Sequence, residues 1–418
     1  MYQVRSYLFR FSDICGILLL ICLISAVPFH FFMSKGSSLS LYRELISSLF
    51  ILLFVIKIIE SEKFNFKIRE EIFFLLLFPV LLCFAAFYDP MVNLYQDKFG
   101  LGTVANTYSN VNPSVYVLRN AVLYIPMTLY LALRGLSKKE IEMIAIATVI
   151  VAPLSIIAYL YSVFEEGNLS IFLLGDMAAY GGANISYNSY VPYLTFPFIA
   201  GLFILAIDSS NLRKLLTLTS IAIMSIFIFL SSSRQSMLFI LFSGFIFLFF
   251  DKSKISKKII FYSSIVLSIF ILYYFVLADV EINERLVNKY ESVGETSRIQ
   301  ILFKGMNLLR PHEFLTGAGL TSVLNSGPHN DYLRWTQRVG LIVMVISFVP
   351  YFVSTYRSWL KIISEKDKPT MIFIMLTTAF TLYHSLFGYP REDAFQSLFC
   401  FLGLALYLGY HQKINRIL

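Results

Sequence analysis

Three basic side chains lie in polar stretches that interrupt a very apolar chain. Arg234 stands in the serine-rich stretch Ser231–Ser236, between two apolar runs. Arg298 and His329 lie in a longer polar stretch, Gly294–Gly340. A guanidinium group holds a phosphate through paired, charge-assisted hydrogen bonds, and a neutral imidazole accepts a proton from a hydroxyl group. Side chains of these types predict a site that binds a phosphate-bearing anion and moves a proton.

Among these basic residues, Arg298 has the local sequence that most strongly indicates an anion-binding site. It is the second residue of Ser297–Gln300, a capping box that begins an amphipathic helix. A cation in the first turn opposes the helix dipole. Its position is better explained if the helix N-terminus and the guanidinium bind an anion together. The alternative is an ordinary exposed arginine.

Arg234 and His329 each have a structural explanation beside the chemical one. A guanidinium among serines can bind phosphate, or it can be a turn residue that reaches toward the membrane interface. Asn330 or Asp331 can cap a helix, which would hold His329 just before a helix N-terminus. The positive end of that dipole favours the neutral imidazole that accepts a proton, although a lone histidine is more often structural.

The composition indicates the kind of fold that positions these residues. Of 418 residues, 57% are hydrophobic and only 14% are charged, and the mean hydropathy is +0.70. A soluble domain holds about 25% charged residues. We therefore predict an all-α polytopic membrane protein that forms a single transmembrane domain over residues 1–418. Apolar runs that can cross a bilayer predict about twelve transmembrane helices: Ile14–Phe32, Leu45–Ile59, Ile72–Tyr88, Val115–Leu133, Met143–Phe164, Tyr190–Ile207, Leu215–Leu230, Met237–Phe250, Ile259–Ala278, Leu341–Tyr356, Met371–Phe387 and Ser397–Tyr410.

Lysine and arginine residues are distributed unevenly among the segments between these spans. With the N-terminus inside, the inner segments hold most cations and the short outer segments hold few, as the positive-inside rule requires. The sequence therefore predicts an even number of spans with both termini cytoplasmic. The long segment Asp279–Arg338, between the ninth and tenth spans, then lies outside as a partly helical, periplasmic catalytic loop.

Ionisable side chains are rare inside the predicted spans, where Lys57 is expected to snorkel to the inner edge. Ion-coupled transporters usually keep such groups at mid-bilayer, so their scarcity argues against a transporter, though not against a flippase with a polar outer cavity. The net charge of +8 reflects cytoplasmic lysines and arginines and does not predict nucleic-acid binding. The four cysteines show no disulfide or metal pattern, and no carboxylates are spaced to hold Mg²⁺. We predict neither a metal nor a cofactor.

Two further arginines are candidates for binding an anionic substrate. Arg119 lies near the outer end of its predicted span and would add a cation there. Arg391 lies in the stretch Gly388–Asp393, where it can join an anion site or form a salt bridge within the turn. Glu392 or Asp393 of the same stretch is an alternative base.

The residues after His329 are expected to help position the substrate. Asn330 and Tyr332 are predicted to contact it. His312 and His384 are predicted to be structural.

The order of these motifs resembles the bacterial O-antigen polymerase and O-antigen ligase superfamily. The resemblance covers Ser231 to about Gly340, and the longest loop has the expected place. The motifs that carry it are SSSRQ at Ser231–Gln235, SRIQIL at Ser297–Leu302, GAGL at Gly317–Leu320 and PHNDYL at Pro328–Leu333.

The resemblance implies a metal-independent glycosyltransferase of GT-C-like architecture. Its donor would be a glycan on polyprenyl (undecaprenyl) diphosphate, used at the outer leaflet of the bacterial inner membrane. Arg234 and Arg298 would bind the diphosphate, and His329 would act as the base or orient the acceptor. A chain-length regulator (co-polymerase) is implied as a protein partner.

The function expected first is that of an O-antigen polymerase, which moves a growing glycan to the terminal sugar of another lipid-linked repeat unit. Abundant Tyr and Asn in the outer segments favours two sugar substrates and hence the polymerase. The first alternative is an O-antigen ligase, which moves the same glycan to lipid A-core. The second is a flippase or other transporter of lipid-linked oligosaccharides.

Overall fold

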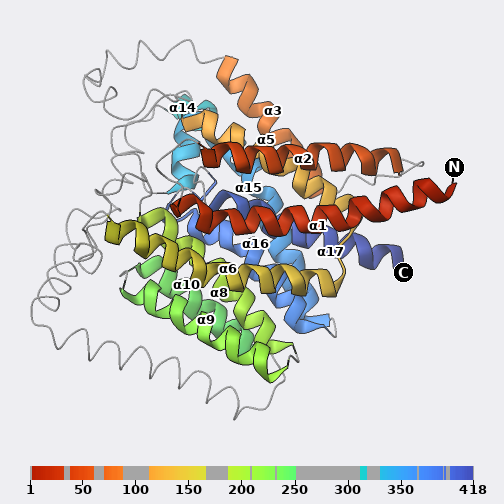
Figure 1. Cartoon of the computed structure of the whole chain (residues 1–418). Coiled ribbons are helices and arrows are strands. Elements are labelled where there is room, and N and C mark those ends of the chain that lie inside the picture. The colour runs from red at the N-terminus through yellow and green to blue at the C-terminus, as the bar shows by residue number, and fades with distance from the viewer. Residues whose placement is uncertain are drawn as a thin grey trace, which may run out of the picture.

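The structure is a computed structural model, and it describes residues 2–32, 38–60, 70–87, 113–165, 187–207, 210–230, 233–250, 311–317, 330–364, 367–388, 390–391 and 396–417. Within these ranges every regular element is an α-helix (Figure 1). The helices are α1 (Tyr2–Phe32), α2 (Ser38–Glu60), α3 (Glu70–Phe87), α5 (Pro113–Arg134), α6 (Lys138–Glu165), α8 (Tyr187–Ala206), α9 (Asn211–Leu230), α10 (Arg234–Phe250), α14 (Pro311–Thr316), α15 (Asp331–Ser364), α16 (Lys368–His384) and α17 (Gln396–Ile417).

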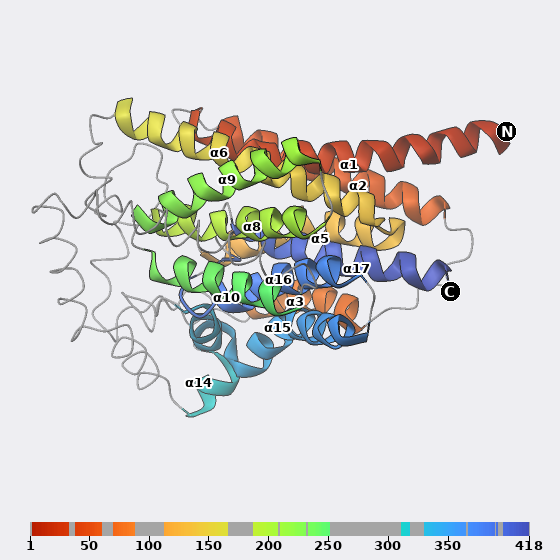
Figure 2. The same cartoon turned by 90° about the horizontal axis from the view of Figure 1, so that it is seen from below.

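The long helices run side by side, and α1 begins at the same end of the bundle at which α17 ends (Figures 1 and 2). We call this the terminal end and the other the distal end. Every predicted span except Ile259–Ala278, which lies outside the described residues, overlaps one of these helices. Among the described helices, the segments Lys138–Tyr161, Asn211–Ile228 and Asp331–Ser364 are long and apolar enough to cross a membrane. The prediction of a helical membrane protein is confirmed, while the twelve spans and the GT-C-like architecture stay predictions.

Helix α8 forms the centre of the bundle because it is apolar on every side. It packs against α6, α9, α10 and α16 (Figure 2). Phe203 stacks on Phe373 of α16 with ring centroids 4.7 Å apart, and Phe196 contacts Phe399 of α17 at 4.6 Å. Side chains of α8, α16 and α17 are buried over most of their length. Packing in this interior holds the helices in place, and the polar residues of the candidate site lie at the ends of these helices.

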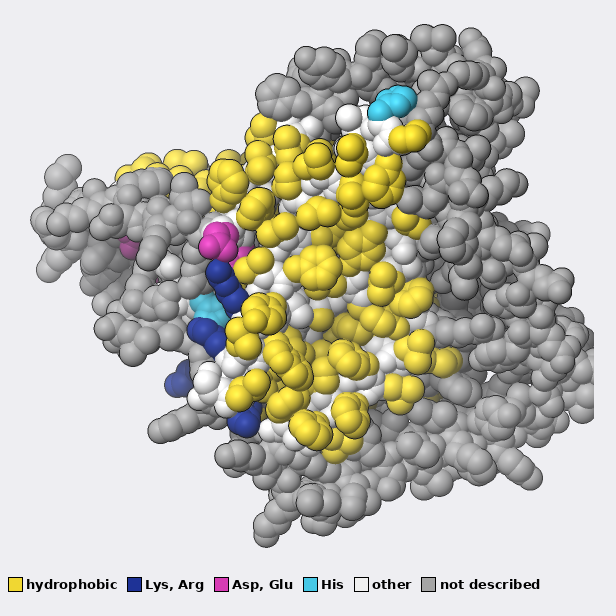
Figure 3. Space-filling view, turned by 180° about the vertical axis from the view of Figure 1, so that it is seen from behind, with side chains coloured by type: hydrophobic (Ala, Val, Ile, Leu, Met, Phe, Trp, Pro, Cys, Tyr) yellow, Lys and Arg dark blue, Asp and Glu magenta, His cyan; other side chains and the backbone are white. Residues whose placement is uncertain are grey.

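A broad apolar surface covers one side of the bundle (Figure 3). Exposed side chains of α10 and α15 contribute to such a surface, among them Phe245, Phe249, Phe352 and Ile363. Basic side chains gather along one edge of this surface in the same view. An apolar belt of this extent is typical of a lipid-facing surface, and a basic edge is typical of its cytoplasmic side.

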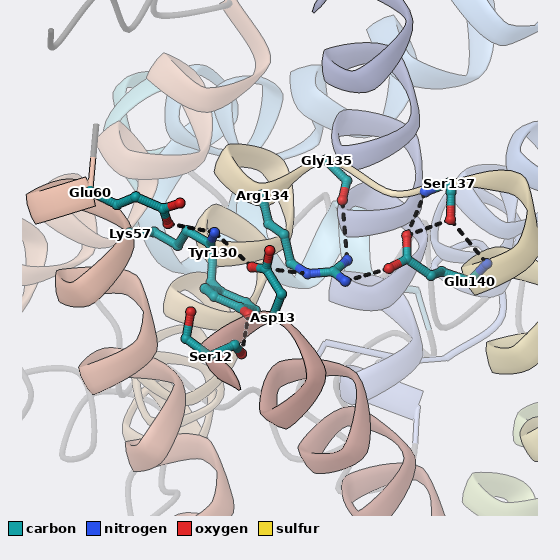
Figure 4. A network of polar contacts seen from close by, with 9 residues as sticks. All are labelled: Ser12, Asp13, Lys57, Glu60, Tyr130, Arg134, Gly135, Ser137 and Glu140. Carbon is teal, nitrogen blue, oxygen red and sulfur yellow. Dashed lines mark hydrogen bonds and ion pairs between the residues drawn. The ribbon is translucent and has the colours of Figure 1, made fainter. Parts of the chain in front are cut away.

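A network of charged side chains ties four helices together toward the terminal end (Figure 4). Lys57 of α2 is buried, and its Nζ lies 2.6 Å from Asp13 of α1 and 2.6 Å from Glu60. Arg134 of α5 pairs with Glu140 of α6, and its Nε lies 3.4 Å from Asp13. Two carboxylates therefore stabilise the charge of Lys57, and its expected snorkelling to the membrane edge stays a prediction. The network fixes α5, whose distal end contributes to the site described next.

Candidate active site

Helix α15 starts at Asp331, two residues after His329, and is held at its first residues by the end of α16. The Asn330 Oδ1 accepts a hydrogen bond from the Leu333 amide at 3.1 Å, so Asn330 is the N-cap. Its Nδ2 donates to the Leu386 carbonyl at 3.1 Å, and the Asp331 amide donates to the Ser385 carbonyl at 2.7 Å. The predicted cap is confirmed, and it binds the chain directly after His329 to the end of α16.

Tyr332 belongs to the same attachment. Its hydroxyl donates to the Leu382 carbonyl at 2.8 Å, and its ring lies 4.2 Å from that of Phe348. The side-chain groups of Asn330 and Tyr332 described here bind backbone groups of the same chain. Their predicted contact with substrate is untested and stays a prediction.

The end of α16 also binds the start of α10, where Arg234 is the first helical residue. The Tyr383 hydroxyl donates to the Gln235 carbonyl at 2.9 Å. The hydroxyl oxygen of Ser233, directly before the helix, lies 2.9 Å from that of Ser236 in the first turn. The end of α16 and the turn that follows it therefore lie between the start of α10 and the start of α15, and they bring the chain neighbours of Arg234 and His329 together.

Arg391, in the connection between α16 and α17, makes a buried ion pair with Asp331. Its Nε donates to Asp331 Oδ2 at 3.0 Å, and the two side chains are only 3% and 0% exposed. Its Nη1 donates to Ser347 Oγ at 2.9 Å. The guanidinium carbon lies 3.9 Å from the ring centroid of Phe348, a cation–π contact. Arg391 is thus paired with a carboxylate outside its own turn.

The carbonyl oxygen of Arg391 connects this pair to α5. It accepts a hydrogen bond from Asn120 Nδ2 at 3.0 Å, and Asn120 directly follows Arg119. The chain neighbours of Arg119, Arg234 and His329 are thus joined at the distal end, although the three residues lie far apart in the sequence.

The structure describes only part of the predicted site. Arg298 and His329 lie outside the described residues, as do Glu392 and Asp393, and the side chains of Arg119 and Arg234 are also not described. Within the described residues, no group of three or more His, Cys, Asp and Glu side chains is placed to hold a metal ion. Metal independence stays a prediction.

His384 is buried at the end of α16, close to this network. Its Nε2 lies 3.0 Å from Thr195 Oγ1, and its ring packs against Phe380 at 4.6 Å and Phe239 at 5.1 Å. Burial against aromatic rings on several sides agrees with the structural role predicted for it. His312 lies exposed on α14, away from this contact.

Helix α15 is bent at Gly340, and the bend is packed against the end of α14. Gly340 has φ 84° and ψ 163°, and Gly317 has φ 83°. A Cβ atom at Gly340 would collide with the Leu315 carbonyl group, and one at Gly317 would collide with the Arg338 carbonyl oxygen. The two backbones therefore touch where side chains would separate them. Gly317 and Gly340 therefore allow the end of α14 to pack directly against the bend in α15.

Sequence reasoning missed Asp331, Ser347 and Asn120 as partners of Arg391. The signal was weak, since Asp331 is most simply interpreted as a helix-capping residue. An arginine that is buried at the outer rim needs a carboxylate partner. A carboxylate that is not needed as the helix cap, here Asp331, is a candidate for that partner.

A sequence model of the family described as O-antigen ligase matches residues 219–348. No curated protein matches the chain. The match begins in α9 and ends in α15, so it includes the start of α10, α14 and the capped start of α15. The predicted resemblance over Ser231 to about Gly340 is confirmed, because the matched segment contains these residues, and residues 219–348 are similar to the O-antigen ligase family.

Proposed function

We propose that the protein is an O-antigen polymerase of the bacterial inner membrane. It transfers a growing glycan from polyprenyl (undecaprenyl) diphosphate to the terminal sugar of a second lipid-linked repeat unit. The family match supports chemistry on lipid-linked oligosaccharides. The observation that carries the proposal is that Asn120, Gln235 and Asp331, which neighbour predicted site residues, belong to one connected group of contacts.

The proposed reaction exchanges one bond for another at the anomeric carbon of the donor glycan. The bond from this carbon to the diphosphate oxygen breaks, and a glycosidic bond to the acceptor hydroxyl oxygen forms. Polyprenyl diphosphate leaves with the electron pair, and Arg234 and Arg298 stabilise its charge. His329 takes the proton of the acceptor hydroxyl. Arg119 adds positive charge at the rim.

The proposed active site faces the periplasm. The connected group lies at the distal end, and both termini lie at the other end (Figure 1). Predicted inner segments are rich in lysine and arginine, which supports a cytoplasmic terminal end. Lipid-linked repeat units would then meet the site at the outer leaflet.

Purified protein in detergent, given a lipid-linked repeat unit as the sole substrate, is expected to produce a ladder of longer glycans. A polymerase needs no other acceptor, because the repeat unit serves as both donor and acceptor. Gel electrophoresis of the released glycans measures the ladder.

The ligase is the second candidate, since the matching family is described by that activity. Products that appear only after lipid A-core is added would replace the polymerase with the ligase. Scrambling of the lipid in liposomes without any product would indicate a flippase.

Removal of divalent cations is expected to leave the initial rate of glycan transfer unchanged. The physical reason is that guanidinium groups carry the positive charge that Mg²⁺ supplies in other diphosphate reactions. The rate is measured with excess chelator and again after Mg²⁺ is restored. Activity that falls with chelator and returns with Mg²⁺ would contradict the role given to Arg234 and Arg298.

A further inference from the structure

Arg391 joins parts of the chain on both sides of the bend in α15. Asp331 stands before Gly340 and Ser347 stands after it, and the guanidinium of Arg391 donates to both. At Gly340 the backbone leaves helical geometry, so the hydrogen bonds of the helix do not by themselves set the angle between the two segments. The guanidinium of Arg391, a planar group with donors in fixed directions, holds the two segments at one angle, together with the contact of α14 at the bend.

We propose that Arg391 and Asp331 are positioning residues, which hold the start of α15 against α16 and α5 in the geometry for glycosyl transfer. This role presupposes the glycosyltransferase function proposed above. It differs from a place in the anion site, which is one of the two roles that the sequence offers for Arg391.

The charge of Arg391 is already balanced inside the protein. Asp331 lies at 3.0 Å, and neither side chain is more than 3% exposed. The rings of Phe348, Trp335 and Phe78 surround the guanidinium at 3.9, 5.5 and 5.4 Å. A substrate diphosphate would have to enter this buried space beside the Asp331 carboxylate, and two anions in one buried site carry a high cost in free energy.

Contacts around the pair connect it to the other site elements. Ser385, at the end of α16, donates its hydroxyl to Asp331 Oδ2 at 3.4 Å. Asn120 of α5 binds the Arg391 carbonyl. A change in the pair therefore alters how the start of α15 lies against α16 and α5. Misplacement of a catalytic group by about 1 Å lowers a rate by about 100-fold.

A double-mutant cycle tests this role through steady-state kinetics with the lipid-linked donor. We expect Asp331→Asn and Arg391→Gln each to lower kcat by about 100-fold with little change in the KM for the donor. Each single variant leaves one charge buried without its partner, whereas the double variant leaves none. The kcat of the double variant is therefore expected to be at least that of the less active single variant. If the two effects were independent, their fold-losses would multiply, so this result is strongly non-additive.

The contrary role predicts a different pattern. If Arg391 binds the diphosphate, Arg391→Gln raises the KM for the donor by the same factor with or without Asp331→Asn, and this result would overturn the proposal. Arg391→Lys keeps the positive charge opposite Asp331 but lacks the planar fork of donors. It therefore tests the geometry of the pair without leaving a buried carboxylate unpaired, which could prevent folding. A positioning role predicts a kcat close to that of Arg391→Gln, and diphosphate binding predicts substantial rescue.

Hydrogen exchange separates failure of this inference from failure of the proposed function. Amides at the start of α15 are expected to exchange faster in Asp331→Asn and Arg391→Gln than in the unchanged protein, while those of α8 are not. This comparison needs no substrate. Unchanged protection at the start of α15 would overturn the positioning role, and absence of any transfer by the unchanged protein would overturn the function.

Discussion

Replacing His329 by alanine is expected to lower the kcat for glycan transfer by about 10²- to 10⁴-fold, the usual contribution of a general base. Without the imidazole, the acceptor hydroxyl must lose its proton to water while it attacks the anomeric carbon. Binding of the donor is expected to persist, because Arg234 and Arg298 hold the diphosphate. The measurements are single-turnover rates and donor affinity for the purified variant.

Two other histidines serve as matched controls for this substitution. His312 lies exposed on α14, so His312→Ala is expected to leave both rate and stability unchanged. His384 is buried beside Phe380 and Thr195, so His384→Ala is expected to lower stability, as loss of a packed side chain does. Near-normal kcat in His329→Ala would show that another group takes the proton, and Glu392 and Asp393 would be tested next.

The places of the long helices along the chain could be predicted from the sequence because they depend on local composition. Long apolar runs predict helices such as α8 and α16, and the structure has helices there. Their limits are less predictable: α15 begins at Asp331, ten residues before the predicted span, because the helix continues through the bend at Gly340. Helix α1 likewise begins at Tyr2, well before Ile14.

Contacts between distant residues could not be predicted in the same way. The cap at Asn330 was predicted because cap and helix are adjacent in the sequence. The partner of Arg391 was not, since Asp331 is 60 residues away and the pair forms only when α15 packs on α16 and the following turn. The same holds for Lys57, whose partner Asp13 is on another helix. Hydropathy alone cannot show which carboxylate will meet a buried cation.

Replacing Gly340 by alanine is expected to destabilise the protein more than any other small substitution in the distal half of the molecule. Its φ of 84° and ψ of 163° lie in a region that is essentially restricted to glycine. Forcing another residue into such a region costs about 1–3 kcal/mol. The new Cβ would also collide with the carbonyl group of Leu315, which is backbone and cannot rotate away. The midpoint of thermal unfolding in detergent measures the effect.

Gly388→Ala is the matched control for that substitution. A Cβ at Gly388 would lie 3.7 Å from the His384 carbonyl oxygen, an ordinary contact, so its unfolding midpoint is expected to stay close to that of the unchanged protein. Gly317→Ala removes the same backbone contact from the other side, because its Cβ would meet the Arg338 carbonyl. We therefore expect Gly317→Ala and Gly340→Ala to be non-additive. If Gly340→Ala is as stable as Gly388→Ala, the close contact between α14 and the bend does not contribute to stability.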